Sequence, residues 1–180
     1  DEAALVAPLG QLPVSFPGSE RFRIVLAGNM GKAQAMDAVL DAAAILQARD
    51  SRVCFVLLGG GVEVNQLKQR TAQLHLSNVI FLPPVPMSEV GTLLYAADAL
   101  LVHLRKDPLF EITIPSKTQA YMAIGKPLLM AVDGDAANLV TQAGGGVVAE
   151  SENGFALAST AEALQNLSLT ARQVMGAKAQ

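Results

Sequence analysis

The chain has 180 residues and a formal net charge of -3, so it carries no broad basic field of the kind that holds nucleic acid. Its residues are 51% hydrophobic but only 4% aromatic, with no Trp, which indicates one domain with an aliphatic core. The lone cysteine, Cys54, excludes an internal disulfide and a multi-cysteine metal site, and no apolar stretch reaches the roughly 20 residues of a membrane span. We therefore expect a soluble, cytoplasmic domain.

Strand and helix patterns alternate along the chain. Residues 1–21, which are rich in proline and show no steady period, indicate a linker, and the domain is expected over 22–180. Short apolar runs that stop at turn residues predict strands, and apolar residues at helical spacing predict the helices between them. The expected strands are 22–27, 52–58, 78–82, 99–104, 127–132 and 146–149; the expected helices cover 32–49, about 64–74, 88–97, 115–124, 135–143 and the sequence from 154 onward.

This alternation predicts a doubly wound α/β fold, in which a parallel sheet of about six strands has helices on both faces. Right-handed crossovers leave few other topologies. Ligands bind such sheets beyond the carboxyl ends of the strands, where the strand order reverses. The turns that follow the strands are therefore the candidate binding loops.

The first of these turns, Gly28-Asn29-Met30-Gly31-Lys32, joins a strand to a helix. Glycines there let backbone N–H groups approach an anion, and a helix N-terminus favours negative charge. The spacing matches neither the Gly-x-Gly-x-x-Gly of dinucleotide binders nor a P-loop. A purely structural tight turn is the alternative.

The loop from 105 to 117 concentrates charge in a chain that is only 16% charged. It holds Arg105, Lys106, Asp107, Glu111, Ser116 and Lys117. Pro115 followed by Ser116 and Lys117 puts a hydroxyl and an ammonium in the first turn of a helix, where a cation opposes the helix dipole. A phosphate between the lysine and the helix would explain this arrangement; solvated charges at a helix start are the alternative.

Several segments in a set order carry a resemblance to a known family. They are 28–34, Gly59-Gly60-Gly61, 80–83, Ile114-Pro115-Ser116-Lys117 and 121–127. Together, over roughly 22–150, they resemble the C-terminal domain of GT-B glycosyltransferases of the retaining family 4, and within it the bacterial surface-polysaccharide branch that includes N-acetyl-fucosamine transferases. The resemblance implies a Rossmann-like half that binds a nucleotide sugar, while a separate N-terminal domain binds the acceptor.

The resemblance also implies roles for individual residues. Lys117 and Glu111 would be catalytic, Lys117 by neutralising phosphate and Glu111 by meeting the sugar or a facing cation. The donor contacts would come from Gly28, Asn29, Gly31, Pro84, Val85, Lys106, Ser116, Asp133, Gly134 and Asp135, with Pro84 and Val85 against the base and 133–135 near the sugar. No tightly bound metal is implied, so cationic side chains must stabilise the leaving diphosphate.

Two features depart from the family pattern. Many relatives carry two glutamates with seven residues between them, and the corresponding positions here hold Ile112 and Ala120. Relatives also carry Arg and Lys in the first turn, where this chain has Asn29 and Gln34. The resemblance implies that these positions usually supply the ribose contact and part of the phosphate clamp, so this chain departs from the family at both.

We expect the donor-binding domain of a hexosyl- or N-acetylhexosaminyl-type transferase. Its donor would be a nucleoside-diphosphate sugar, and we expect UDP as the nucleotide. Its acceptor would be a saccharide or a lipid-linked molecule, the latter at the inner membrane face. Because a complete GT-B enzyme has two such domains, this chain alone should bind donor without turnover; a naturally split transferase is the alternative.

Two other functions remain open. One is a non-catalytic nucleotide- or partner-binding module. The other is an NAD-linked oxidoreductase domain, which the absent fingerprint and the absent acid after Leu58 disfavour. His75 and His103 have no partner at ligand spacing, so we expect both to be structural and no metal site.

Overall fold

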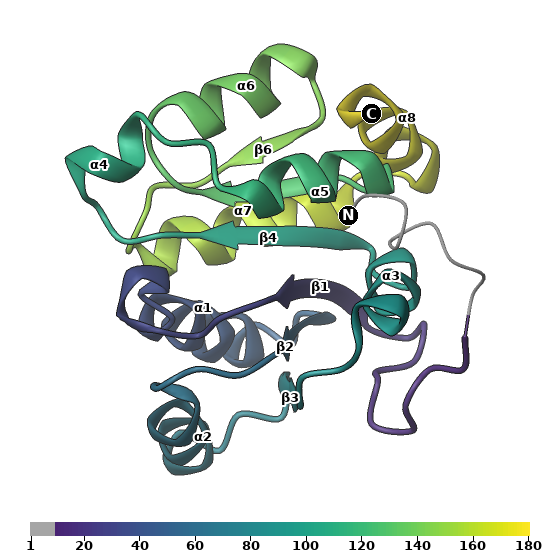
Figure 1. The fold of residues 1–180 in the computed structure, drawn as a ribbon. Helices are drawn as coiled ribbons and strands as arrows, with labels where there is room; N and C mark the ends of the chain where they lie inside the picture. Colours follow the sequence, from purple (N-terminus) through teal and green to yellow (C-terminus); the bar gives the residue numbers. More distant parts are fainter. Residues whose placement is uncertain (1–9) are drawn as a thin grey trace.

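The protein folds around one six-stranded parallel sheet with the strand order β3-β2-β1-β4-β5-β6 (Figure 1). The computed structural model describes residues 10–180, so residues 1–9 of the expected linker lie outside it. The strands are β1 (Phe22–Ala27), β2 (Val53–Leu58), β3 (Val79–Leu82), β4 (Ala99–His103), β5 (Leu128–Ala131) and β6 (Gly146–Val148). The predicted doubly wound sheet of six strands is confirmed.

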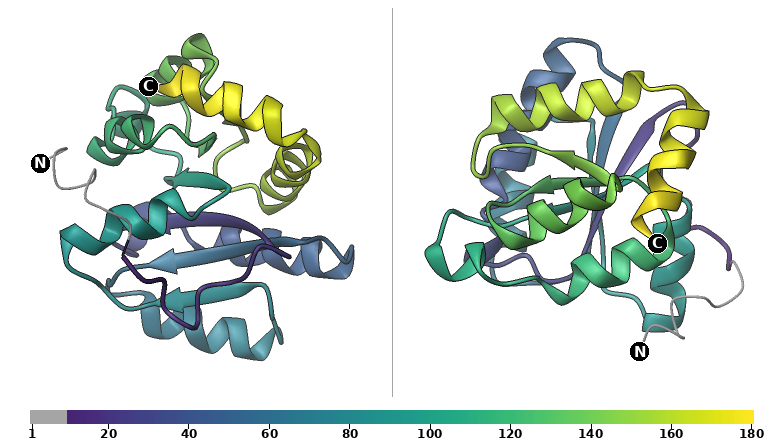
Figure 2. Two further views of the ribbon diagram at one scale, coloured as in Figure 1. Left: turned by 90° about the vertical axis from the view of Figure 1, so that its right-hand side faces the viewer. Right: turned by 90° about the horizontal axis from the view of Figure 1, so that it is seen from above.

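Helices cover both faces of the sheet (Figure 2). They are α1 (Asp37–Ala48), α2 (Val64–Gln73), α3 (Met87–Tyr95), α4 (Pro108–Glu111), α5 (Ser116–Ile124), α6 (Asp135–Ala143), α7 (Gly154–Asn166) and α8 (Leu169–Ala179), with a short 3-10 helix, η2, at Lys32–Gln34. One face packs against α1, α2 and α7, and the other against α3, α5 and α6. No helix in the described range is long and apolar enough to cross a bilayer.

The central strands are buried on both faces because their side chains are almost all aliphatic. Along β1, Ile24 and Leu26 point to the face of α1 and α7, and Val25 points to the face of α3 and α5. All three are fully buried, and each contributes about 1.5–3 kcal/mol by leaving water. The continuous apolar runs of the sequence are thus the strands of a covered parallel sheet.

The described part of the expected linker lies against the domain. Phe16 is only 7% exposed and belongs to the apolar cluster on the α3 face. The amide of Gly10 donates to Thr92 Oγ1 in α3 at 2.9 Å. These contacts tie residues 10–16 to the α3 side of the sheet.

Two helical segments differ from the sequence prediction. The helix expected over 32–49 is split into η2 and α1, because Ala35 adopts a left-handed conformation with φ 45°. The short α4 was not expected at all, although Asp107 caps it by accepting the amide of Leu109, and Pro108 occupies its first turn. Its four residues show no apolar period that a sequence pattern could reveal.

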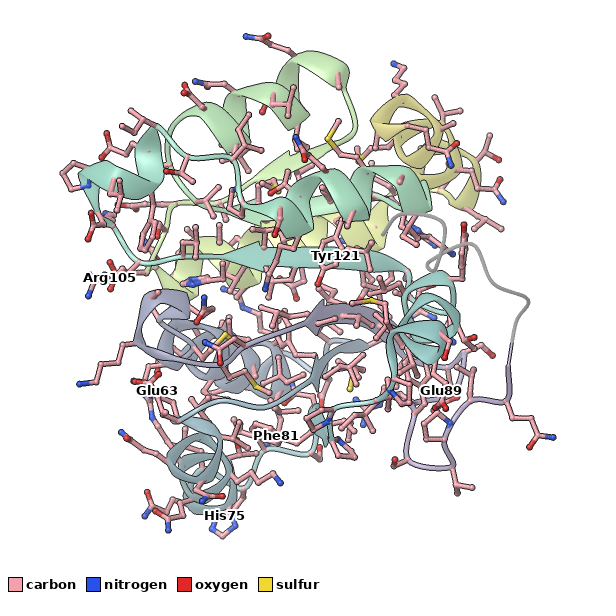
Figure 3. All side chains as sticks on the ribbon, viewed as in Figure 1. Glu63, His75, Phe81, Glu89, Arg105 and Tyr121 are labelled. Atoms are coloured by element: carbon pink, nitrogen blue, oxygen red, sulfur yellow. The ribbon has the colours of Figure 1, made fainter. Side chains whose placement is uncertain are left out.

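The strand order reverses between β1 and β4, and here the sheet opens. β1 pairs with β2 along six residues, from Phe22–Val53 to Ala27–Leu58, but with β4 only at Ile24–Ala99 and Val25–Leu100. Beyond that point the Tyr121 hydroxyl of α5 replaces β4: it accepts the amide of Ala27 at 2.7 Å and donates to the Ala27 carbonyl at 3.2 Å. Tyr121 thus lies between α5 and the sheet (Figure 3) and joins the two.

Gly59 should not tolerate a side chain. It has φ +137°, and a Cβ there would lie 2.0 Å from the carbonyl oxygen of Gly28. We expect Gly59→Ala to lower the free energy of unfolding by about 2–4 kcal/mol in urea titrations, since it combines backbone strain with a backbone clash. Gly60→Ala is the matched control, because a Cβ there would meet only Pro84 Cγ at 3.4 Å. Equal effects of the two substitutions would contradict this account.

Tyr121→Phe should also destabilise the fold. The substitution keeps the ring but removes the oxygen that accepts the Ala27 amide, and an unpaired buried donor costs about 1–3 kcal/mol. Tyr95→Phe serves as the control, because the half-buried Tyr95 hydroxyl has no hydrogen-bond partner within residues 10–180. Comparison of urea midpoints at constant m-value checks the prediction, and a Tyr121→Phe variant as stable as Tyr95→Phe would refute it.

Candidate functional site

A cavity of about 780 Å³ opens at the carboxyl ends of β1, β2 and β3, between α3 and α5. This volume is within the range of small-molecule sites, about 300–1,000 Å³. Its floor is made by strand ends and the turns after them, and its walls by two helices. The lining residues are Ala27, Gly28, Asn29, Leu58, Gly59, Gly60, Pro84, Val85, Met87, Val90, Leu94, Ser116, Lys117, Gln119, Ala120 and Tyr121. The cavity therefore lies beside the switch point of the sheet, where the topology predicts a ligand.

Lys117 faces the first glycine turn across this cavity. A Cβ built on Gly28 would lie 3.2 Å from Lys117 Nζ, so the absence of a side chain at Gly28 leaves room for the ammonium. Burial lowers the pKa of Lys117 from its usual value. None of the ion pairs in residues 10–180 includes Lys117. A partly buried ammonium without a counter-charge makes this part of the cavity favourable for an anion.

The N-terminus of α5 adds a second attractive feature for an anion. Pro115, its N-cap, supplies no side-chain cap, and the first turn contains no acidic residue. The amides of Ser116 and Lys117 therefore have no acceptor in the described part of the chain. Such amides and the positive end of the helix dipole together favour negative charge.

The glycine turn itself has fewer free donors than its sequence indicates. The amide of Gly28 donates to Leu58 O at 2.8 Å, and that of Met30 donates to Gly60 O at 2.7 Å. The amide of Gly31 donates to Gln34 Oε1 at 3.0 Å. These three bonds shape the turn, so an anion in the cavity would meet Lys117 and the start of α5 rather than these amides.

The wall opposite α5 is apolar. Pro84 and Val85 follow β3, and Met87, Val90 and Leu94 lie on the cavity side of α3. Met87 is 58% exposed although it is a large apolar side chain. The spacing of the apolar residues in α3 indicates one apolar helix face, but it does not show whether protein or a cavity covers that face.

The structure brings six of the predicted site residues to the cavity and places the others elsewhere. Gly28, Asn29, Pro84, Val85, Ser116 and Lys117 line it, whereas Gly31, Lys106, Glu111, Asp133, Gly134 and Asp135 do not. The second set, apart from Gly31, gathers beyond β4 and β5. There, a Cβ on Gly134 would lie 2.0 Å from the Glu111 carbonyl oxygen, so the turn before α6 packs on the end of α4.

Lys106 is engaged by acidic residues of the turn before α7. Its ammonium lies 2.7 Å from Glu150 Oε1, which raises the pKa of Lys106 and lowers that of Glu150. Its backbone amide donates to Glu152 at 2.6 Å. The neighbouring Arg105 lies at the carboxyl end of β4, well away from Tyr121 (Figure 3).

Ala120 and Ile112, the two positions where the resemblance implies glutamates, lie apart in the structure. Ala120 lines the cavity, where it presents only a methyl group, and Gln119 beside it supplies an amide. Ile112, at the end of α4, is 73% exposed and outside the cavity. The cavity wall formed by α5 therefore carries an amide and a hydroxyl. It carries no carboxylate at Ala120, the position where the resemblance implies a glutamate.

The two histidines lie apart from each other. His75 is exposed at the end of α2 (Figure 3), and His103 is buried at the end of β4. Over residues 10–180 no group of three or more His, Cys, Asp or Glu side chains is placed to hold a metal ion.

Comparison with known proteins gives a family and a fold. The family model described as "Glycosyl transferases group 1" matches residues 13–180. The chain is similar to Anabaena HepE in complex with UDP and glucose, with a TM-score of 0.75 and 20% identity over 90% of this chain and 43% of HepE. It is also similar to the C-terminal domain of LpcC from Francisella tularensis, a glycosyl transferase group 1 family protein, with a TM-score of 0.75 and 16% identity over 99% and 93% of the two chains.

A third similar structure is that described as trehalose-6-phosphate from E. coli bound with UDP-2-fluoro glucose, with a TM-score of 0.76 and 12% identity over 99% of this chain and 44% of that one. The chain thus spans less than half the length of the HepE and E. coli proteins. No curated protein matches it in sequence. On the family match and the shared fold, the chain belongs to the glycosyl transferases group 1 family and has the fold of the C-terminal domain of a GT-B enzyme.

Proposed function

We propose that the cavity between α3 and α5 binds a nucleoside-diphosphate sugar, and that the domain is the donor half of a glycosyltransferase. The observation that carries this proposal is the unpaired ammonium of Lys117, which faces Gly28 at the start of α5 in a cavity at the switch point. The UDP, glucose and UDP-2-fluoro glucose bound to the two longer similar structures support a UDP-linked donor.

The diphosphate would lie between Lys117 and the amides of Ser116 and Lys117. A charge-assisted contact and a helix N-terminus act there together on the same anion. When the sugar leaves the donor, negative charge grows on the diphosphate, and preorganised positive groups stabilise it. Lys117 is therefore the residue we propose as catalytic, because it is the cation nearest the leaving group.

The base would lie on the apolar wall. Pro84, Val85 and Met87 offer a surface that binds a flat aromatic ring by burial and dispersion rather than by charge. Gln119 is a polar side chain on the opposite wall of the cavity, so we propose it for the ribose hydroxyls.

The sugar would extend from the diphosphate toward the second cluster of predicted site residues. Glu111 and the 133–135 turn lie together there because Gly134 packs on the end of α4. We propose this cluster for the donor sugar, of hexosyl or N-acetylhexosaminyl type. Lys106, already paired with Glu150, would contribute to the field there rather than hold the diphosphate directly.

The acceptor would be bound by a second domain, as a saccharide or a lipid-linked saccharide of surface-polysaccharide synthesis, the latter at the inner membrane face. Transfer without a tightly bound metal stays a prediction. Loss of UDP binding after dialysis against a chelator would contradict it.

A non-catalytic nucleotide-binding module is the second candidate, and Ala120 favours it because a methyl group lines the cavity where relatives of the family place a carboxylate. Calorimetry with UDP, UDP-glucose and NAD tests for the donor site: binding of the UDP compounds alone supports either candidate, and no binding of any nucleoside diphosphate refutes both. Sugar transfer by the chain together with an acceptor domain then separates the two candidates.

Lys117→Ala should weaken UDP binding. Loss of one charge-assisted contact costs about 1.5–3 kcal/mol, which raises the Kd roughly 10- to 150-fold. Lys178→Ala is the control, because Lys178 is an exposed lysine of α8 that does not line the cavity. If the calorimetric Kd of Lys117→Ala equals that of the control, Lys117 does not bind the diphosphate.

UDP binding should also weaken as the pH rises. Burial lowers the pKa of Lys117, so the free domain loses the ammonium charge at a lower pH than an ordinary lysine does, and must take up a proton to bind a diphosphate. Affinity should therefore begin to fall at a pH below the ordinary lysine value near 10.4. Lys117→Arg stays charged throughout, so its affinity should fall less than that of the unaltered chain; parallel profiles for the two proteins would exclude Lys117 as the titrating group.

A further inference from the structure

His103 is a buried titratable side chain that the proposed site does not use. It ends β4, is 1% exposed, and follows Ala99 and Leu101 in pointing to the face of α1 and α7, opposite the cavity. Its Nδ1 lies 2.7 Å from the carbonyl oxygen of Gln34. Because a carbonyl oxygen only accepts, Nδ1 carries the proton and donates it.

The remaining ring nitrogen fixes the charge of this histidine. Nε2 is buried and has no hydrogen-bond partner within residues 10–180. Burial lowers the pKa of His103, although the bond to Gln34 and the charge of Glu152 oppose this. The side chain is therefore a neutral imidazole with one defined tautomer and one directed hydrogen bond.

That bond reaches the glycine turn through a single residue. The Gln34 backbone accepts from His103, while the Gln34 side chain accepts the amide of Gly31 at 3.0 Å and lies 3.5 Å from Asn29 Nδ2. Next to it, the Arg105 amide donates to the Ala33 carbonyl at 2.9 Å. The end of β4 thus holds η2, and η2 holds the turn that lines the cavity.

The turn needs such a restraint because the backbone directly after it is strained. Ala35, directly after Gln34, has φ 45°, and a left-handed conformation at a residue other than glycine persists only where its surroundings impose it. Without the His103 bond, the Gln34 carbonyl would lose a buried partner and the strained residue would lose one of its restraints.

We propose that His103 is a positioning residue for the donor site: through the Gln34 carbonyl it holds the Gly28–Gln34 turn in the shape in which Gly28 faces Lys117. This inference rests on the proposed function for its effect on donor binding. His103 lies on the far face of the sheet from the cavity and does not itself contact the ligand.

Two amide substitutions of similar polarity test the role of Nδ1. His103→Asn places an N–H donor at the position of Nδ1, whereas His103→Gln places its donor near Nε2. We expect His103→Asn to bind UDP nearly as the unaltered chain does, and His103→Gln to raise the calorimetric Kd about tenfold, as expected for one lost hydrogen bond. Equal Kd values for the two variants, both folded by circular dichroism, would overturn the proposal.

Gln34→Ala shows whether the effect passes through the turn. It removes the side-chain bond to Gly31 but keeps the carbonyl that His103 binds. If His103 acts through Gln34, the changes in Kd caused by Gln34→Ala and His103→Gln should not multiply in the double variant, because both release the same turn. Independent, multiplicative effects would contradict the proposed route.

Amide hydrogen exchange of the free protein tests the restraint on the turn without relying on UDP binding. The Gly31 amide, which is bonded to Gln34 Oε1, should exchange faster in His103→Gln than in His103→Asn without any ligand present. If the unaltered chain does not bind UDP, the proposed function fails, but faster Gly31 exchange would still establish the restraint. If the chain binds UDP and Gly31 exchange is the same in both variants, the positioning role fails alone.

Discussion

The site depends on how closely α5 approaches the open end of β1. β4 stops pairing with β1 after two residues, and the Tyr121 hydroxyl takes over both backbone groups of Ala27. That bond fixes the distance between the helix that carries Lys117 and the turn that begins with Gly28. The opening of the sheet thus creates the cavity. The buried Tyr121 hydroxyl pairs with the amide and the carbonyl of Ala27, so the opening leaves neither group without a partner.

Glycine makes this geometry possible at the turns around the cavity. Gly59 and Gly61 have positive φ values, and a Cβ on either would meet the backbone of the first turn within 2.3 Å. The turns after β1 and β2 therefore touch backbone to backbone. This close packing uses amides that the sequence offers to a ligand, so positive charge in the cavity comes from Lys117 and the N-terminus of α5 instead.

The split between the cavity and the cluster beyond β4 and β5 gives the domain two regions with different chemistry. The cavity is largely apolar with one unpaired ammonium, which suits a base and a diphosphate. The outer cluster contains Glu111 and the 133–135 turn, with Lys106 held by Glu150, which suits the hydroxyl groups of a sugar. A nucleotide sugar has the same sequence of chemistries along its length.

The sequence by itself determined the sheet and most helices, and six of the twelve residues that it predicted for a site line the cavity. Aliphatic runs such as β2 require a strand that is buried on both faces of the sheet. Because alternating strands and helices form a parallel sheet with right-handed crossovers, the residues that directly follow the strands, such as Gly28 and Pro84, could be assigned to the same edge of the sheet.

Tertiary structure alone decided the rest. The break at Ala35 arises from bonds that His103 and Arg105 make across 69 or more positions. The contact of Gly134 with Glu111 joins the turn before α6 to the end of α4. Local patterns record a residue's own period and polarity, whereas a left-handed alanine, a hydroxyl that replaces a strand, or an apolar helix face that lines a cavity depends on which distant atoms lie beside it.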